Sequence, residues 1–236
     1  MDELFRDRLL NYNRFVISVG GRVGSGKTTG ARTLHDLLRI NLPSFGVINM
    51  SDVILRECGR DEHGEGRYYF RQVDGVWVVN EELKAKDRKG IITPYSCRRM
   101  AANPYCWLQL VLTGEKNLII TGLDRTEADT EVAALLGRHL CRVYIDSSVE
   151  NCARRRFPDL PPPIARTRYE EECLASKLEL HAASNRHLAD LFVTNDGSET
   201  AFNEGLEGLV SHFTAAFVAS HAAVSPPNLV TASAAW

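Results

Sequence analysis

A glycine-rich stretch near the N-terminus restricts the possible folds of this chain more than any other feature. The apolar run 16–19 leads into it, and residues 21–28 then follow the spacing G-x-x-x-x-G-K-[ST] in full. Helix-forming residues continue over 31–39. A strand, a glycine loop and a helix in this order form the context in which the pattern binds phosphate. The sequence therefore predicts a phosphate-binding loop between a buried strand and a helix.

Each residue type in this loop suits a phosphate. Glycines let backbone N–H groups approach anionic oxygens that a side chain would keep away, and the start of a helix adds the positive end of its dipole. Lys27 would reach the β- and γ-phosphates of a nucleotide, and the hydroxyl of Thr28 would face a magnesium ion. The residues expected to bind the nucleotide phosphates are Gly21, Gly24, Ser25, Gly26, Lys27, Thr28 and Thr29.

The composition argues against several other classes of protein. The chain has 236 residues and a net charge of −2, so no overall basic field would attract nucleic acid or an anionic membrane. Its six cysteines form no C-x-x-C pair, which favours free thiols in a reducing cytosol. No apolar run approaches the roughly 18 residues of a membrane span, and the N-terminus is too charged for a signal peptide. We expect a cytoplasmic monomer or homodimer without nucleic-acid or membrane partners.

Apolar runs alternate with helical patterns along most of the chain. The expected strands are 14–19, 45–49, 117–121, 140–146 and 190–194. The expected helices are 2–10, 27–40, 51–58, 81–89, 95–112 with a kink or break at Pro104, 128–137, 149–157, 166–187 and 199–219. Loops are expected over 59–66 and, extended by prolines, over 158–163. This alternation implies parallel βαβ units, and therefore one three-layer α/β/α domain over 1–220 with a five-stranded parallel sheet and a flexible tail, 221–236.

Residues 68–79 interrupt the alternation. Two β-rich runs flank Asp74 and Gly75, and Asp-Gly between such runs is the strongest short signal for a hairpin. Because an antiparallel hairpin does not belong in a doubly wound sheet, we interpret residues 60–80 as an insertion over the site. Its aromatic side chains form either a small packing cluster or a surface on which a base stacks.

Charged residues after the second strand suit an acceptor molecule. Asp52 and Arg56 fall on the helix that follows this strand, at the carboxyl edge of the sheet, where ligands of such folds bind. Asp52 either serves only as the helix cap, a role that Ser51 could also fill, or contacts the acceptor. Farther along, Arg98 and its neighbour Arg99 either grip an acceptor phosphate or are surface charge.

The order of these motifs resembles the P-loop kinases of nucleoside monophosphates, which include adenylate kinase, cytidylate kinase and their archaeal relatives. The glycine loop comes first, then S-D-x-x-x-R, then T-G-L-D-R-T after a strand, then an arginine-rich helix with prolines, and finally N-D-G-S. The segment 189–198 is also similar to dephospho-coenzyme A kinase. The resemblance covers residues 14–215 without the hairpin.

This resemblance implies roles for individual residues. Asp52 and Arg56 would lie on the helix that binds the acceptor, with Arg56 and Arg125 on its phosphate, and Arg166 would act from the far side of the lid. Arg98 is counted with these substrate-binding residues from its position in the chain alone. The helix that carries Arg154, Arg155 and Arg156 would begin a mobile lid, about 150–170, in which one arginine packs on the donor base and others meet the transferring phosphoryl group. Residues 195–198 would line the donor adenine. The residues expected to act in catalysis are Lys27, Asp52, Arg125 and Arg155, and Arg154 and Asn195 would help to bind ATP.

The chain departs from the family at the end of the third core strand. The family has a magnesium-linked aspartate there, whereas this chain has Thr121. Either Asp124 takes over through a water molecule, so that Thr28 and Asp124 organise the metal, or Asp52 carries the metal side, as the base-like aspartate does in dephospho-coenzyme A kinase.

The resemblance and the loop together predict an enzyme that uses ATP and Mg²⁺. It would move the γ-phosphoryl group of ATP to a nucleoside monophosphate or a related phosphate-bearing small molecule. Alternatives within the same class are a kinase like dephospho-coenzyme A kinase and a kinase of a specialised metabolite. Outside it, the alternatives are a P-loop NTPase switch with a protein partner and a catalytically inactive nucleotide-binding scaffold.

Overall fold

The computed structural model describes residues 15–41, 45–112, 117–122, 139–175 and 185–223. Within these ranges the chain forms a five-stranded sheet in the order β2-β5-β1-β6-β7 and a separate two-stranded hairpin, β3-β4. Every neighbouring pair in the larger sheet is parallel. The predicted α/β fold with a five-stranded parallel sheet and an inserted hairpin is therefore confirmed.

The strands and helices have the following bounds. The strands are β1 Phe15–Gly20, β2 Phe45–Asn49, β3 Phe70–Val73, β4 Val76–Val79, β5 Asn117–Thr121, β6 His139–Asp146 and β7 Leu191–Thr194. The α-helices are α2 Lys27–Asn41, α3 Met50–His63, α4 Glu81–Asp87, α5 Thr93–Ala102, α6 Cys106–Leu112, α8 Val149–Arg156, α9 Pro162–Leu174 and α11 Glu199–Ala223. A π-helical turn, Arg88–Ile92, joins α4 to α5, and a 3₁₀ turn covers Asn185–Leu188.

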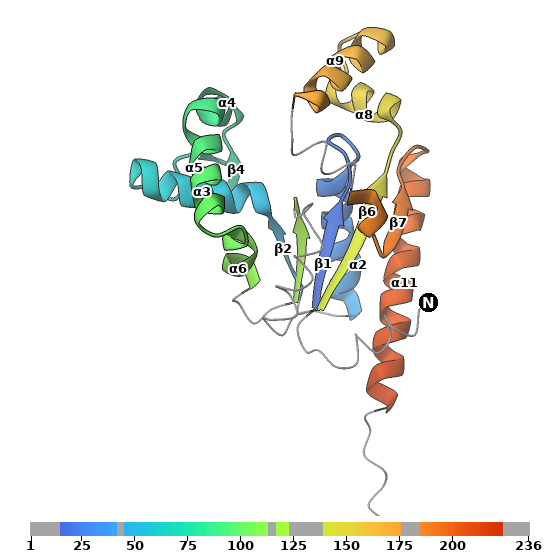
Figure 1. Ribbon diagram of the computed structural model, residues 1–236. Coiled ribbons are helices and arrows are strands. Elements are labelled where there is room, and N and C mark those ends of the chain that lie inside the picture. The colour runs from blue at the N-terminus through green and yellow to red at the C-terminus, as the bar shows by residue number, and fades with distance from the viewer. Residues whose placement is uncertain (1–14, 42–44, 113–116, 123–138, 176–184, 224–236) are drawn as a thin grey trace, which may run out of the picture.

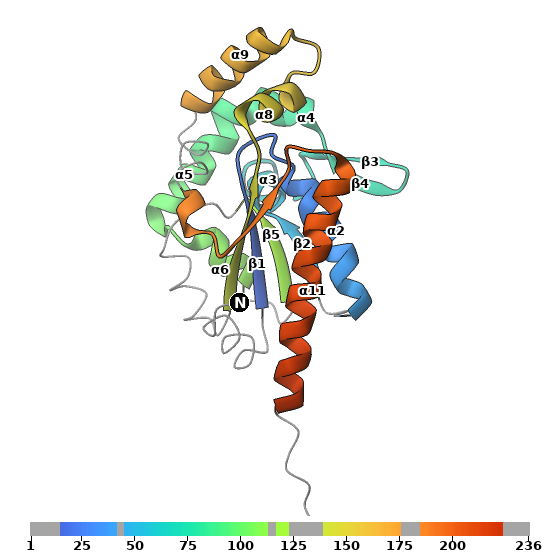
Figure 2. The ribbon, with the colours of Figure 1, turned by 90° about the vertical axis from the view of Figure 1, so that its right-hand side faces the viewer.

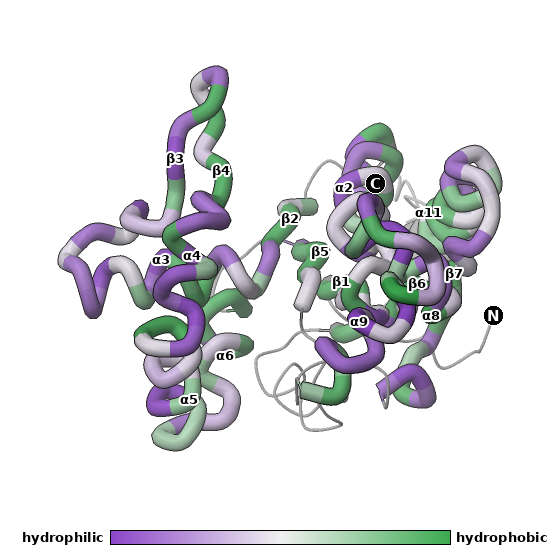
Figure 3. The backbone as a smooth tube through the Cα atoms, turned by 90° about the horizontal axis from the view of Figure 1, so that it is seen from above, coloured by the Kyte–Doolittle hydropathy of each residue, from purple (hydrophilic) through white to green (hydrophobic). Residues whose placement is uncertain are grey.

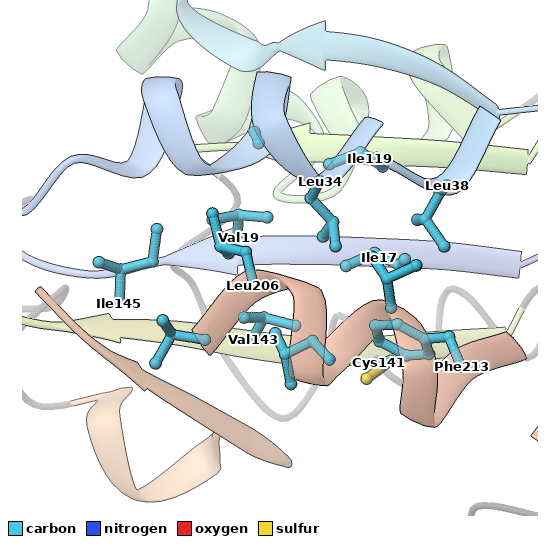
Figure 4. Packing of buried hydrophobic residues seen from close by; sticks show 14 of the residues in the cluster. Ile17, Val19, Leu34, Leu38, Ile119, Cys141, Val143, Ile145, Leu206 and Phe213 are labelled. Carbon is cyan, nitrogen blue, oxygen red and sulfur yellow. The ribbon is translucent and has the colours of Figure 1, made fainter. Parts of the chain in front are cut away.

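β1 is the central strand, and successive side chains on it point to opposite faces of the sheet. Ile17 and Val19 lie in the cluster formed with α2 and α11, whose members Leu34, Leu38, Leu206 and Phe213 are shown in Figure 4. Val16, on the other face, belongs to a second cluster that contains residues of α3, α5 and α6. The sheet is therefore covered on both faces, as its continuous apolar strands predict.

Residues 50–112 form an inserted lobe that contains α3, the hairpin, α4, α5 and α6. The lobe connects β2 to β5, which are neighbours in the sheet. In Figures 1 and 3 it stands beside β2, whereas α8 and α9 lie above the carboxyl ends of the strands. Figure 2 shows the hairpin projecting outward from this lobe. These two parts flank the end of the sheet at which the glycine loop lies.

α3 is longer than predicted, so the loop expected over 59–66 is wrong for its first half. The helix continues to His63 and ends at Gly64, which has a φ of 73° and donates its N–H to the carbonyls of Arg60 and Gly59. Gly59 lies inside the helix because the returning chain passes close by: a Cβ there would lie 2.6 Å from the carbonyl oxygen of Glu65. This glycine serves a close approach and does not end the helix.

The helix predicted over 166–187 is wrong at both ends. α9 begins at Pro162, since a proline fits the first turn of a helix, where its missing N–H has no intrahelical partner. The extended segment expected over 158–163 is therefore wrong: its last two residues begin α9, and before them the N–H of Leu160 closes a turn onto the carbonyl of Phe157 at 3.2 Å. α9 ends at Leu174. Residues 185–188, which include the predicted end of this helix, form a 3₁₀ turn and not an α-helix. The break predicted at Pro104 is confirmed, since α5 ends at Ala102 and α6 begins at Cys106.

Several predictions fall outside the described residues. These are the helices expected over 2–10 and 128–137, the roles of Asp124 and Arg125, and the tail from residue 224 onward. α11 extends to Ala223, beyond the expected end at 219. In the described part of the chain, no helix has the length and apolar character needed to cross a membrane.

The hairpin has the turn that its sequence predicts. Asp74 and Gly75 both have positive φ, 49° and 78°, which is the backbone of a two-residue hairpin turn that matches the twist of the strands. Of its aromatic neighbours, Tyr69 is fully buried, and Tyr68 stacks on His63 with ring centroids 3.7 Å apart. These contacts favour the packing cluster over a base-stacking surface for the residues that precede the hairpin.

Candidate active site

The glycine loop between β1 and α2 has a backbone that depends on its glycines. Gly21, Gly24 and Gly26 have φ values of 138°, 78° and 97°, which side-chain-bearing residues rarely adopt. At Gly24 a Cβ would lie 2.7 Å from the carbonyl oxygen of Cys152. At Gly26 it would lie 2.5 Å from the side-chain amide of Asn195. The loop is thus pressed against the segments that follow β6 and β7.

The carbonyl groups of this loop are turned outward and accept hydrogen bonds from side chains. The ammonium of Lys27 donates to the carbonyls of Gly21 and Arg22 at 2.5 and 2.9 Å. The next three carbonyls accept from more distant side chains: Val23 from the hydroxyl of Tyr169 at 2.8 Å, Gly24 from the guanidinium of Arg155 at 3.3 Å, and Ser25 from the amide of Asn195 at 2.8 Å. In a trans peptide the C=O and the following N–H point in opposite directions. The carbonyls of Val23 and Ser25 are held by side chains from outside the loop, so the N–H groups that follow them, those of Gly24 and Gly26, face its inner side. The N–H of Ser25 closes a turn onto Arg22.

The start of α2 completes the loop. α2 begins at Lys27 and has no acidic residue in its first turn, so nothing there cancels the positive end of its dipole. Thr28 and Thr29 are exposed in that turn. Inward N–H groups, a helix start and a lysine on the loop are the donor set that a nucleotide phosphate requires. The residues predicted to bind the donor phosphates are therefore brought together.

Arg155 and Asn195 lie on the outer side of this loop and bond to each other. The guanidinium of Arg155 donates to the backbone and side-chain oxygens of Asn195 at 2.7 and 3.1 Å and to the hydroxyl of Ser147 at 3.1 Å. Asn195 is 8% exposed. Their contacts hold the shape of the loop, and the nucleotide contacts assigned to them by resemblance stay predictions.

Asp196 holds the neighbouring turn together. Its carboxylate accepts from the backbone N–H of Ser148 at 2.7 Å and from the side chains of Ser147 and Asn151, both at 2.9 Å. Burial acts to raise the pKa of Asp196, but these hydrogen bonds outweigh it and lower the pKa to about 2. Asp196 is therefore a carboxylate that fixes the ends of β6 and β7 beside the loop.

Asp52 is free of the capping role that its sequence position allowed. The prediction of Ser51 or Asp52 as the cap is wrong, because α3 begins at Met50 and the side chain of Asn49 accepts from the N–H of Ser51 at 3.1 Å. Burial raises the pKa of Asp52. The positive charges of Lys84, Arg56 and Arg32 oppose that rise.

These cations come from different elements around Asp52. Arg32 lies on α2, Arg56 on α3, and Lys84 on α4, the helix that follows the hairpin in the chain. The guanidinium of Arg56 lies 5.4 Å from the centre of the Phe70 ring. A half-buried carboxylate among cations from the core and from the inserted lobe suits an acceptor that carries both a hydroxyl donor and negative charge.

The other predicted arginines are engaged with surface groups. Arg98 pairs with Glu62, and Arg166 pairs with Glu150 and Glu170. Arg154 donates to the side chain of Asn151 at 2.9 Å. To contact a substrate, each of these side chains must first leave its present partner. Their roles in binding remain predictions.

The metal side of the site has two described ligand candidates, the hydroxyl of Thr28 and the carboxylate of Asp52, whereas Asp124 lies outside the described residues. Thr121 ends β5 and is 3% exposed, so it offers no carboxylate where the resembling family has one. Among the described residues, no group of three His, Cys, Asp or Glu side chains could hold a metal ion. A magnesium ion at this site would therefore be held mainly by nucleotide phosphates, with Thr28 and one carboxylate, which is the usual manner of this ion.

Some residues at the site could not be found from sequence. Tyr169 lies 146 positions from the loop carbonyl to which it donates, and no spacing rule links such residues. The sequence also gave no reason to place Arg32 and Lys84 near Asp52, because lysines and arginines on helices are usually solvated. The N-D-G-S run did single out Asp196, but as part of the segment that lines the adenine and not as the carboxylate that holds the neighbouring turn together.

Comparisons with known proteins give no family for the chain and only distant structural likeness. No protein-family model matches the sequence, and no curated protein matches it. A shikimate kinase from Bacteroides thetaiotaomicron has a TM-score of 0.47 at 12% identity, covering 85% of this chain and 98% of that chain. A dephospho-CoA kinase from Campylobacter jejuni has a TM-score of 0.44 at 12% identity, with coverages of 86% and 98%. A gluconokinase from Sinorhizobium meliloti has a TM-score of 0.44 at 12% identity, with coverages of 86% and 95%. Likeness at this level carries no argument about activity, so the proposals below depend on the site itself.

Proposed function

We propose that this chain is an ATP-dependent phosphotransferase that moves the γ-phosphoryl group, with the help of Mg²⁺, to a small acceptor. A nucleoside monophosphate or a related phosphate-bearing molecule is the acceptor class that we favour. A kinase like dephospho-coenzyme A kinase or a kinase of a specialised metabolite would use the same site.

One observation carries the proposal: the carbonyls of residues 21–25 all accept bonds from side chains, so the backbone of the loop is held in one shape. A loop fixed in this form needs no rearrangement when a phosphate arrives, and fixed dipoles stabilise charge better than mobile ones. The side chain of Lys27 is the part of the phosphate site that would move when a nucleotide binds. Its ammonium lies on the carbonyls of Gly21 and Arg22 and can turn to the β- and γ-oxygens.

The chemistry needs positioning and positive charge more than covalent steps. As the phosphoryl group moves, negative charge spreads over its equatorial oxygens. Lys27 and the N–H groups of the loop would stabilise this charge on the donor side, and a bound magnesium ion would neutralise the β- and γ-phosphates. On the acceptor side, Arg56 and Arg32 would orient an anionic group, and Asp52 would hold the attacking oxygen.

The charged surroundings of Asp52 favour a kinase over a simple nucleotide hydrolase. A half-buried carboxylate with cationic neighbours on α2, α3 and α4, and one acidic neighbour, Glu81, would supply a second polar site for an acceptor. An NTPase switch needs no such site. The one feature that favours the switch is Thr121, which stands where the kinases have the metal-linked aspartate.

The test is an ADP-release assay with ATP and Mg²⁺ over a panel of acceptors. The panel contains ribo- and deoxynucleoside monophosphates, a modified pyrimidine monophosphate and dephospho-coenzyme A, with a no-acceptor control. Lys27→Ala is expected to lower turnover by about 10²–10³-fold, the usual effect of removing a well-placed charge. Lys89→Ala, which removes an exposed lysine from the π-helical turn, is the matched control and is expected to leave turnover unchanged.

Each pattern of ADP release has a defined meaning. Release that depends on one acceptor and on Lys27 supports the kinase and names its substrate class. Equal release in every well, including the control, indicates the NTPase switch instead. No release in any well, with no binding of ATP, would contradict nucleotide use altogether.

A further inference from the structure

Tyr169 connects the helical pair α8–α9 to the glycine loop. Its hydroxyl donates to the backbone carbonyl of Val23 at 2.8 Å, and its ring is 1% exposed. Tyr169 lies on α9, in the segment that the sequence predicted to be part of a lid. Val23 lies in the middle of the loop, between Gly21 and Gly24. The contact thus joins a distant helix to the part of the backbone whose shape decides phosphate binding.

A small apolar cluster holds this tyrosine in place. Its buried members are Cys152, Ala153, Ala165 and Tyr169, and the partly buried side chains packed on them are Val23, Val149, Phe157, Leu160 and Cys173. The cluster therefore contains residues of α8, of α9 and of the loop itself. Because packed interiors resist small displacements, the position of the Tyr169 hydroxyl is fixed relative to the loop.

The chemistry of the hydroxyl suits a permanent donor. Burial raises the pKa of Tyr169, and the neighbouring Cys152 and Cys173 add to the rise. The hydroxyl therefore keeps its proton throughout the physiological range of pH. On the other side of α8, Arg155 holds the next carbonyl, that of Gly24, at 3.3 Å. Two successive loop carbonyls are thus held by α9 and α8.

We propose that Tyr169 is a positioning residue for the phosphate loop, and that α9 supports the loop instead of moving independently of it. This inference rests on the proposed function, since it assigns to α9 the task of holding the loop that binds the donor phosphates. α9 cannot swing away as a rigid lid unless the bond to Val23 breaks and the apolar cluster opens. Movement of α9 and the shape of the loop are therefore coupled.

The test removes the hydroxyl alone. Tyr169→Phe keeps the ring in the apolar cluster and deletes the donor to Val23. The matched control is Tyr95→Phe, which removes the hydroxyl of another buried tyrosine, one that donates to Asp61 in the inserted lobe at 2.6 Å. The first measurement is amide hydrogen exchange at Ser25, whose N–H closes the loop turn onto Arg22 at 3.1 Å. The amide of Gln109, bonded to the carbonyl of Tyr105 in the inserted lobe at 2.9 Å, is the internal reference.

The second measurement is calorimetric titration with inorganic tripolyphosphate, which contains no base or ribose. Loss of one hydrogen bond predicts an increase of about three- to tenfold in exchange at Ser25 and a similar weakening of tripolyphosphate binding in Tyr169→Phe. Exchange at Gln109 in Tyr169→Phe and both loop measurements in Tyr95→Phe are expected to stay unchanged. A merely structural tyrosine would lower the unfolding temperature without this selective effect on the loop.

Two results would overturn the inference. The first is unchanged exchange at Ser25 in Tyr169→Phe, and the second is faster exchange with unaltered tripolyphosphate affinity. If the unmodified protein does not bind tripolyphosphate, the proposed function fails by itself, whereas exchange at Ser25 still decides whether Tyr169 holds the loop.

Discussion

At the scale of single residues, the glycine loop shows how little freedom each position has. Gly24 faces the carbonyl of Cys152, and Gly26 faces the side chain of Asn195. Both glycines therefore serve two purposes, since each adopts a positive φ and also leaves room for a neighbouring segment. The pattern G-x-x-x-x-G-K-[ST] predicted the first purpose, and the second is visible only in three dimensions.

Gly24→Ala should displace the loop. The left-handed backbone alone costs about 1–2 kcal/mol for a residue with a Cβ, and the contact with Cys152 at 2.7 Å adds to this cost. We expect affinity for ATP to fall roughly 10- to 100-fold, as when one or two charge-assisted hydrogen bonds of about 1.5–3 kcal/mol are lost. Titration calorimetry measures the affinity. Gly90→Ala, with open space around its Cβ position, is the control, and equal affinities in the two variants would contradict the prediction.

Asp196 predicts an acid-sensitive part of the stability. Its pKa is about 2 in the folded chain, against an ordinary value of 3.8. Between these values the unfolded chain binds a proton that the folded chain does not, so this contribution is complete above about pH 4 and is lost as the pH falls toward 2. The unfolding temperature of the unmodified protein should exceed that of Asp196→Asn at pH 6, and the difference should shrink by pH 3. A difference that is constant with pH would show that the carboxylate charge is not involved.

The phosphate side of the site could be predicted from sequence, whereas its support could not. Residues of the loop are close together in the chain, so their spacing alone implies their geometry. Tyr169, Arg155 and Asp196 reach the loop from far along the chain, and only the packing of α8, α9 and β7 brings them there. The acceptor side was predicted in part, because Asp52 and Arg56 follow a strand, but Arg32 and Lys84 join them through tertiary structure.

At the scale of elements, two glycines inside helices distinguish the conformational effect of adding a Cβ from its steric effect. Gly208 lies in α11 with nothing within 4 Å of its Cβ position, whereas Gly59 lies in α3 with the carbonyl of Glu65 only 2.6 Å away. Gly208→Ala should stabilise the protein by about 0.5–1 kcal/mol, because alanine has less freedom to lose on folding. Gly59→Ala should destabilise it by about 1–3 kcal/mol, as overpacking does. Urea unfolding measures both, and equal signs would refute the distinction.

Element boundaries were predicted well where a local rule decides them. The turn at Asp74 and Gly75 and the break at Pro104 follow from backbone chemistry that the sequence displays. The end of α3 and the start of α9 were missed. At α3 the glycine that looks like a helix end, Gly59, is needed for packing against the returning chain. At α9 the prolines that look like a loop form the first turn of the helix.

At the scale of the whole molecule, the inserted lobe and the sheet share one core. Val16 and Ile120 of the sheet lie in the same buried cluster as Tyr69 and Trp107 of the lobe. We therefore expect both parts to unfold in one cooperative transition. In a Trp77→Phe, Trp236→Phe background, fluorescence reports on the buried Trp107 and far-UV circular dichroism on the whole chain. The two urea midpoints should coincide, whereas an earlier fluorescence transition would mean that the lobe unfolds separately.

The strand order has a consequence for the synthesis of this protein. β1 leaves the ribosome early, but its neighbours in the sheet, β5 and β6, begin only at Asn117 and His139. At a translation rate of about 5–20 residues per second, roughly 5 to 25 s separate the first strand from its partners. During that interval an apolar strand has both edges unpaired, which is the state in which strands associate with other chains. The topology that encloses β1 in the finished molecule thus leaves it exposed for longest during translation, and high yields should depend on rapid synthesis or on chaperones that cover this segment.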